Sequence, residues 1–377
     1  MPVITDALDD AESLSAADRD GLLRSAAMAG AQVRAVAEAQ AEGVLGPLGD
    51  LRPRAVVVVT GGSPIAARAA ALVVAILGSR IDVPIAVSPA LPGWIGPLDV
   101  VVVLGADAGD PHLADAASRA GRRRAEVVIA APVEGPLREV IGDRDRGDLP
   151  ILDLSPRLPV DPRFRFTGHV ASLVAVLTAL TAVRLTPPPP ELAVLADQLD
   201  AESAADHPGL DSFTNQAKQL ALRAADHACV WSGDTAGATV LAAQTASTFF
   251  SVGGVPTAAA DEATGLAALT ATSSAAIDSI FYDPEFDGPA RDEQRRLFLI
   301  TTAAREWYVR QRLGARDADV VTEQVGGESE NTADAVADRV PAAEPFTDTP
   351  GDLTAYLITA TRAELAAAYL ALGRAAA

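Results

Sequence analysis

One apolar run that ends in glycines constrains the fold more than any other feature of the chain. Residues 56–63 have the sequence VVVVTGGS, and an alanine-rich segment with helical spacing, Ala66–Leu77, follows. A continuous valine run is typical of a parallel strand buried on both faces. A glycine loop before a helix presents backbone N–H groups and the positive end of the helix dipole to an anion. The sequence therefore predicts a parallel α/β sheet with a small-anion site at Gly61, Gly62 and Ser63.

The spacing of this loop excludes the commonest cofactors. It lacks the Gly-x-Gly-x-x-Gly pattern of a dinucleotide site and the Gly-Lys-Ser/Thr ending of a P-loop. We therefore expect no nicotinamide cofactor and no nucleoside triphosphate, and a sugar phosphate or similar anion fits better. The plainer alternative is that Ser63 only caps the following helix.

Composition narrows the class of protein. The chain has 377 residues, 49% of them hydrophobic, and a mean hydropathy of +0.20, which allows a large core and suggests two domains. A formal charge of −20 argues against nucleic acid or an anionic membrane as a partner. The run Val170–Val183 is too short to cross a bilayer, so we expect a buried helix there and no membrane span.

The termini and the cysteine content give further expectations. The N-terminus begins acidic and lacks the regions of a signal peptide, which predicts a cytoplasmic protein. Cys229 has no partner for a disulfide, and the four histidines are scattered without metal-ligand spacing, so we expect no metal site.

The order of predicted elements gives an α/β fold of two doubly wound parallel-sheet domains behind an N-terminal helical arm. The predicted ranges are a helical arm at 1–52, a first α/β domain at 53–186, a linker containing Pro187–Pro190 at 187–212 and a second α/β domain at 213–377. In the second domain we expect strands at 228–231, 279–282 and 297–301, and a closing helix over Asp352–Leu372. The acidic stretch Gly326–Thr349 is expected to be loop or a short helix.

Several motifs occur in an order that resembles the bifunctional phosphoglucose/phosphomannose isomerases, which are built from two sugar-isomerase (SIS) domains. The resemblance covers about Pro53 to Leu372 and implies the two-domain fold, a sugar-phosphate ligand and a homodimer. The motifs are Thr60-Gly61-Gly62-Ser63, the loop Gly105–Asp110, Pro162-Arg163, Asn215–Ala221 and Tyr369-Leu370-Ala371.

The second loop departs from the family pattern. The family carries a loop similar to Ser-Tyr-Ser-Gly-Asn-Thr, whose hydroxyls bind the phosphate, whereas this chain has Ala106–Pro111 with only Gly109 in common. Hydroxyl donors are replaced by carboxylates at Asp107 and Asp110, and a carboxylate repels phosphate. We therefore expect weak phosphate binding at this loop.

The catalytic positions depart as well. Aldose–ketose isomerisation needs a base beside the carbonyl and an acid to open the ring. Alignment with the family places Gln244 where the base belongs and Ala260 where the histidine belongs, and neither side chain can do that chemistry. The family's C-terminal lysine has no counterpart. Glu262, or Asp261 beside it, is the fallback base if the alignment is shifted.

The remaining candidates each have a structural alternative. Arg163 is a ligand residue in the resemblance, but it could equally be a solvated loop arginine. Lys218, the only lysine in the chain, could bind the ligand or form a salt bridge within its helix. His207 and His227 would catalyse only if the fold brought them to the site.

These observations predict a cytoplasmic SIS-type protein with little or no isomerase activity. The resemblance implies in addition a role in carbohydrate metabolism, binding of a carbohydrate derivative and a homodimer. Two alternatives stay open. One is an active isomerase with rearranged catalytic residues, and the other is a non-catalytic structural or regulatory partner of another sugar-phosphate enzyme.

Overall fold

The chain divides into two compact units. The computed structural model describes residues 4–142, 150–275, 295–314, 316, 318–324 and 347–376. The first sheet unit comprises residues 24–204 and 348–357, and the second sheet unit comprises the described parts of 1–23, 205–347 and 358–377. The sequence boundaries at 52, 186 and 212 stay predictions.

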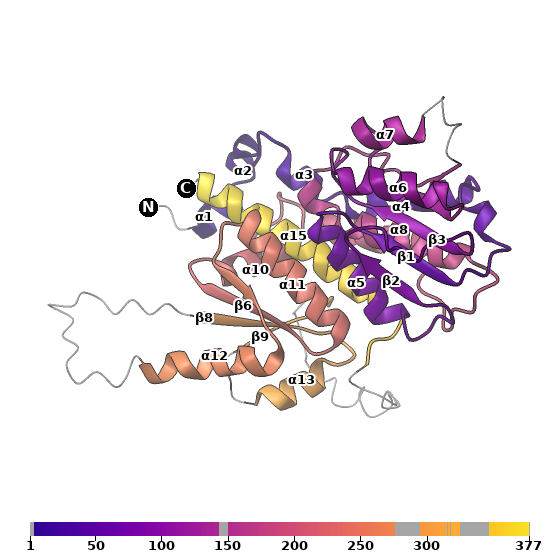
Figure 1. The fold of residues 1–377 in the computed structure, drawn as a ribbon. Coiled ribbons are helices and arrows are strands. Elements are labelled where there is room, and N and C mark those ends of the chain that lie inside the picture. The colour runs from indigo at the N-terminus through magenta and orange to yellow at the C-terminus, as the bar shows by residue number, and fades with distance from the viewer. Residues whose placement is uncertain are drawn as a thin grey trace, which may run out of the picture. The chain divides into compact units, whose positions relative to one another are not determined.

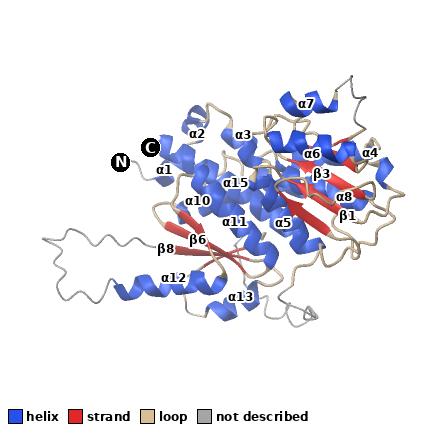
Figure 2. Cartoon of the chain, viewed as in Figure 1, coloured by secondary structure: helices blue, strands red, loops and turns tan. Residues whose placement is uncertain are grey.

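The first sheet unit contains a five-stranded parallel sheet in the order β2-β1-β3-β4-β5. Its strands β1, β2 and β3 are labelled in Figure 1, and Figure 2 draws the strands in red. The chain leaves β1, forms β2 on one side of it, and returns to form β3 on the other side. The loops that follow β1 and β3 therefore lie next to each other at the carboxyl edge of the sheet, where ligands bind in open α/β folds. The strands are β1 (Ala55–Val59), β2 (Ile85–Ser88), β3 (Asp99–Leu104), β4 (Glu126–Ala130) and β5 (Leu152–Asp153).

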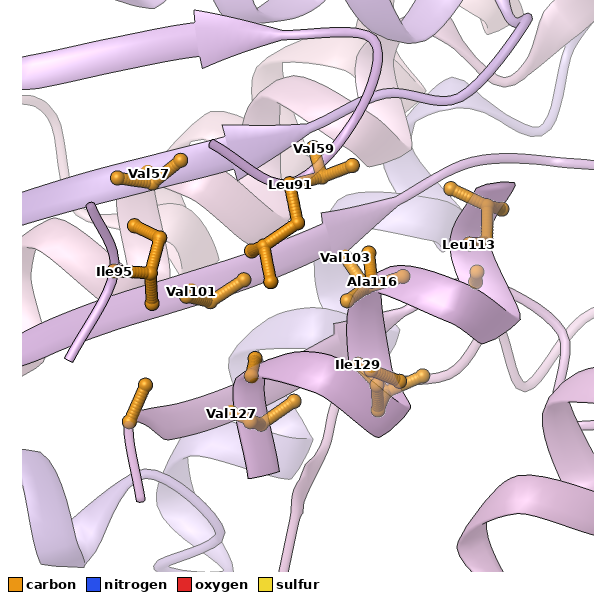
Figure 3. Packing of buried hydrophobic residues seen from close by; sticks show 14 of the residues in the cluster. Val57, Val59, Leu91, Ile95, Val101, Val103, Leu113, Ala116, Val127 and Ile129 are labelled. Carbon is orange, nitrogen blue, oxygen red and sulfur yellow. The ribbon is translucent and has the colours of Figure 1, made fainter. Parts of the chain in front are cut away.

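A valine-rich core covers one face of this sheet. Figure 3 shows side chains of β1, β3 and β4 gathered against Leu113 and Ala116 of α6. The residues that alternate with them, such as Val56 and Val100, are buried too, so both faces are covered, as the valine run predicts. The strand side chains shown are Val57, Val59, Val101, Val103, Val127 and Ile129.

Side chains at the loop ends start two of the surrounding helices. Ser63 caps α5, Asp110 caps α6, and a proline follows each cap in the first helical turn. Helix α8 packs against both α4 and α5. The helices that lie wholly or mostly in this unit include α3 (Leu22–Ala26), α4 (Ala29–Ala41), α5 (Pro64–Leu77), α6 (Pro111–Arg122), α7 (Gly135–Ile141), α8 (Phe166–Ala179) and α9 (Leu192–Ala205), with 3-10 turns η1 (Gly46–Leu48) and η2 (Pro162–Phe164).

The second sheet unit contains a four-stranded parallel sheet in the order β7-β6-β8-β9. The strands are β6 (Ala228–Gly233), β7 (Thr257–Ala259), β8 (Arg295–Ile300) and β9 (Asp319–Val321). The helices are α1 (Ile4–Asp9), α2 (Ala11–Ala17), α10 (Gln216–Ala224), α11 (Ala236–Ser251), α12 (Glu262–Ala275) and α13 (Glu306–Leu313), and the long helix α15 (Asp352–Ala376) contributes to both units. The expectation of two parallel-sheet α/β units is confirmed.

Some local elements differ from the sequence expectations. Helix α9 lies within the predicted linker, and β7, β9 and α12 were not predicted. The two strands have three residues each, too few for a periodic apolar pattern to identify. The expected strand at 279–282 and nearly all of the acidic stretch fall outside the described residues.

The N-terminal helical region is broken into short helices. Asp10 ends the first of them by capping the next one, α2. The segment expected to be a buried helix at Val170–Val183 is largely α8, which ends at Ala179 and is buried along most of its length. In the part of the chain that the structure describes, none of the helices has the length and apolarity needed to cross a membrane.

Aromatic stacking organises the core of the second sheet unit. Trp231 of β6 is fully buried, and its ring centroid lies 4.4 Å from that of Phe298 and 4.8 Å from that of Phe249. The three rings join strands β6 and β8 to helix α11. Such a cluster combines a large buried apolar area with favourable ring geometry.

We expect the Trp231→Ala variant to lose about 3–5 kcal/mol of unfolding free energy, because a fully buried ring leaves a cavity that its neighbours fill only in part. Urea unfolding followed by circular dichroism measures this. The matched control is Trp307→Ala in α13, whose side chain is 55% exposed, and it should cost less than about 1 kcal/mol. Equal losses in the two variants would contradict the assignment of Trp231 to the core.

Candidate functional site

The glycine loop lies where the sequence predicts it, directly after β1 at the carboxyl edge of the first sheet. Gly61 has a φ of +55°, a left-handed conformation that favours glycine. Ser63 accepts a hydrogen bond from the backbone N–H of Ala66 at 3.2 Å. The capping alternative for Ser63 is therefore realised, and its hydroxyl is one of the fixed groups of the loop.

A carboxylate of the chain itself sits on this loop. Asp110 Oδ2 accepts the backbone N–H of Gly62 at 2.7 Å, and Asp110 Oδ1 accepts the N–H of His112 at 2.8 Å. A Cβ atom added to Gly61 would lie 2.1 Å from Asp110 Oδ2, so only glycine permits this approach. Asp110 thus joins the loops after β1 and β3. The N–H of Gly62 at the sheet edge already has this carboxylate as its acceptor.

In the loop after β3, a second carboxylate also accepts a backbone N–H group. The N–H of Gly109, the residue shared with the family loop, donates to Asp107 Oδ1 at 2.8 Å. The two carboxylates that replace the family's hydroxyls therefore both accept backbone N–H groups of these loops. This arrangement stabilises the loops through charge-assisted hydrogen bonds and opposes the entry of a second anion.

Arg163 lies in the turn η2 and pairs with Asp161. Its Nη2 is 2.7 Å from Asp161 Oδ2 and its Nε is 3.0 Å from Asp161 Oδ1. This forked ion pair lowers the pKa of Asp161, mainly through the side-chain hydrogen bond from Arg163. The guanidinium is 45% exposed, so a ligand role would require it to turn away from Asp161.

Lys218 of α10 lies in the second sheet unit and holds a loop. Its buried Nζ donates to the carbonyls of Pro208 at 2.8 Å and Leu210 at 2.6 Å, and it lies 5.5 Å from the ring centroid of Tyr369. Burial lowers the pKa of Lys218. Asn215 caps the same helix by accepting the N–H of Lys218. The motif that carried part of the resemblance thus has a structural explanation here.

The corresponding edge of the second sheet carries a buried ion pair that the sequence did not single out. Asp234 follows β6, and its Oδ2 accepts from Thr301 Oγ1 at 2.6 Å and from Arg305 Nε at 3.0 Å. Burial raises the pKa of Asp234. Both charged side chains are at most 7% exposed. An aspartate directly after an apolar strand is the one sequence feature that could have identified this pair.

The residues aligned with the family's catalytic groups, and the two fallback carboxylates, make hydrogen bonds or ion pairs within the chain. Gln244 is buried in α11 and donates from Nε2 to Thr248 Oγ1 at 3.2 Å. Ala260 follows β7; its N–H donates to the carbonyl of Trp231 at 2.9 Å, and its carbonyl accepts from Ser232 Oγ at 2.8 Å. Glu262 accepts from Arg312 at both carboxylate oxygens, at 3.0 and 2.9 Å. Asp261 accepts from the N–H and hydroxyl of Thr264.

Two of the histidines have local backbone partners. His207 Nδ1 accepts the N–H of Gly209 at 3.0 Å, and His227 Nδ1 lies 2.5 Å from the carbonyl oxygen of Ala225. Both are in the second sheet unit, whereas the glycine loop is in the first. Within the described ranges, no group of three or more histidine, cysteine, aspartate or glutamate side chains is arranged to hold a metal ion.

His169 differs from these histidines because it is 3% exposed within α8. Burial lowers the pKa of His169 to about 3, and the positive charge of Arg165 adds to the shift. The native state therefore keeps this imidazole neutral at pH values where the unfolded chain, with a pKa of about 6.5, takes up a proton.

We expect the stability advantage of the wild type over His169→Gln to shrink by about 1–2 kcal/mol between pH 7 and pH 5, because only the wild type must exclude that proton in its native state. Urea unfolding at the two pH values measures the difference. The Val170→Ala variant, which alters a buried neighbour without removing a titrating group, should keep a constant difference. The same pH dependence in both variants would contradict a buried neutral His169.

Comparison with known proteins gives a match in structure. No protein-family model and no curated protein sequence matches the chain. The structure resembles the C-terminal domain of glucosamine-fructose-6-phosphate aminotransferase from Francisella tularensis, with 12% identity, a TM-score of 0.54, and coverage of 95% of this chain and 97% of that one.

It also resembles tagatose-6-phosphate ketose/aldose isomerase from Escherichia coli, with 14% identity, a TM-score of 0.55, and coverage of 93% of this chain and 91% of that one. At such low identity the likeness concerns the fold. The chain therefore has the two-sheet α/β fold of SIS-domain phosphosugar isomerases.

Proposed function

We propose that this chain is a phosphosugar-isomerase-fold protein that binds a carbohydrate derivative without isomerising it. The observation that carries the proposal is the 2.7 Å hydrogen bond from the N–H of Gly62 to Asp110 Oδ2. A phosphate oxygen that approached the loop would have to displace this carboxylate. The expected consequence is weak binding of phosphorylated ligands at the first sheet edge.

The chemistry of the aligned positions supports the absence of turnover. An amide at Gln244 and a methyl group at Ala260 cannot move the protons of an aldose–ketose isomerisation. The fallback base Glu262 has both oxygens engaged by Arg312. General acid and base groups contribute about 10²–10⁴-fold each, so a site that lacks them retains little rate.

The proposal keeps the predicted relationship to the phosphoglucose/phosphomannose isomerases, together with a homodimer in the cytoplasm. Ligand contacts at the first sheet edge are assigned to Gly61, Gly62, Ser63 and Gly109. Arg163 contacts the ligand only if its ion pair with Asp161 breaks. A ligand role for Lys218 would require it to give up two carbonyl partners, whose loss is costly for a buried ammonium group.

We expect purified protein to show no isomerase activity on glucose 6-phosphate or mannose 6-phosphate above the enzyme-free rate, measured by a coupled assay for the ketose product. The reason is the lack of a base and an acid at the aligned positions. Robust turnover that Glu262→Gln abolishes and Gln244→Ala leaves unchanged would overturn the proposal, because the active site would then have been rebuilt on other residues.

The Asp110→Ser variant should bind inorganic phosphate at least ~10-fold more tightly than the wild type, because it frees the Gly62 N–H and removes a repelling charge. Serine is also a good helix cap, so α6 should keep its start. Isothermal titration calorimetry gives the dissociation constants.

The matched control is Asp115→Ser, which removes the same charge from an exposed position of α6 where Asp115 pairs with Arg119. It should bind phosphate as the wild type does. An equal gain in both variants, or tight phosphate binding by the wild type, would show that Asp110 does not close the loop.

A further inference from the structure

A polar pocket lies in the first sheet unit, and neither Asp110 nor the glycine loop lines it. It has a volume of about 30 Å³ and lies between α4, the start of α8, the end of β4 and the segment that follows β5. Apolar side chains such as Val36 and Leu154 form part of its wall. The polar groups that line it include Gln32, Arg165 and His169. A pocket of this size exceeds the ~10–15 Å³ that one water molecule needs.

Two buried polar atoms of the lining residues have no hydrogen-bond partner among the described residues. They are Gln32 Oε1 and His169 Nε2, and the two residues are 5% and 3% exposed. Gln32 Nε2 donates to the carbonyl of Phe164 at 2.9 Å, which fixes the amide so that Oε1 stays an acceptor. Buried polar atoms without partners are rare in native proteins and call for a ligand, a water or another explanation.

The position of Gln32 depends on a glycine. A Cβ atom added to Gly168 of α8 would lie 2.7 Å from Gln32 Oε1. The absence of a side chain at Gly168 lets the amide of α4 lie against α8 beside the pocket. The acceptor is thus positioned by the bond to the Phe164 carbonyl and by the space that Gly168 leaves.

Arg165 supplies a positive charge without a carboxylate partner in the described part of the chain. Its Nη2 donates to the carbonyl of Leu158 at 3.0 Å, and burial lowers the pKa of Arg165. Arg157, which also lines the pocket, pairs with Glu42 at 2.8 Å. A half-buried cation that lacks a counter-charge is unfavourable, and an incoming anion would stabilise it.

We propose that this pocket binds the carboxylate end of a small hydroxy acid. The carboxylate lies against the guanidinium of Arg165, and the neighbouring hydroxyl donates to Gln32 Oε1. The neutral imidazole of His169 completes the polar lining. The apolar wall accommodates the carbon chain of such an acid, which inorganic phosphate lacks.

The test is calorimetric titration of the full-length protein with glycolate, acetate and inorganic phosphate. We expect saturable glycolate binding with a dissociation constant of order ~1 mM, and weaker binding of acetate, which lacks the hydroxyl donor. If the pocket holds only ordered water, glycolate will show no saturable binding up to ~100 mM, and the proposal is overturned. Phosphate binding tighter than glycolate would overturn the choice of a carboxylate.

Variants locate the binding. Arg165→Gln should weaken glycolate binding at least ~10-fold, whereas Arg119→Gln, an arginine of α6 in the same unit, should leave it unchanged. Ala35→Leu fills the pocket without altering a charge and should also abolish binding, so the result does not depend on the folding of one variant.

Nuclear magnetic resonance gives an independent readout. Glycolate should shift the imidazole signals of His169, assigned with His169→Gln, more than those of the other three histidines. Calorimetric binding that persists in Arg165→Gln and Ala35→Leu, with His169 unmoved, would place the ligand elsewhere.

Discussion

The parallel pairing of β1 between β2 and β3 is the constraint on which the first sheet unit depends. Because both faces of β1 are buried, its polar neighbours can only appear where the strand ends, and the pairing with β3 brings the next loop to the same edge. The Gly61–Gly62 turn and Asp110 meet there as a direct consequence. A carboxylate 48 positions along the chain can then accept the N–H of Gly62.

Both sheets carry a buried or bridging aspartate at the edge where ligands bind in this fold. In the first sheet Asp110 accepts backbone N–H groups, and in the second Asp234 accepts from Thr301 and Arg305. Such contacts stabilise the loops but consume donors that a phosphorylated ligand would otherwise use. Removal of one partner of a buried charged pair is costly, so the pair of Asp234 and Arg305 holds the second sheet edge rigid.

In contrast to the two sheet edges, the pocket beside Arg165 contains polar groups that lack partners within the described residues. The charge of Arg165 lacks a carboxylate partner within the described residues, and two buried polar atoms beside it lack hydrogen-bond partners. At the sheet edges, carboxylates of this acidic chain accept from the donors. In the pocket between α4 and α8, we propose that the guanidinium of Arg165 and Gln32 Oε1 serve as donor and acceptor for a ligand. The pocket proposed for a hydroxy acid is therefore separate from the glycine loop.

The sequence by itself determined the two parallel sheets, because runs such as Val56–Val59 and the alternation with helices leave few other ways to bury apolar residues. It also identified the glycine turn and the carboxylates that replace hydroxyls at Asp107 and Asp110. Short edge strands such as β7 were not predicted, because three residues are too few to show a periodic apolar pattern. Only the tertiary structure decided which N–H each carboxylate accepts, that Lys218 holds a loop, and that Arg165 lies near a neutral His169, since these contacts join residues whose proximity depends on how the helices and loops pack.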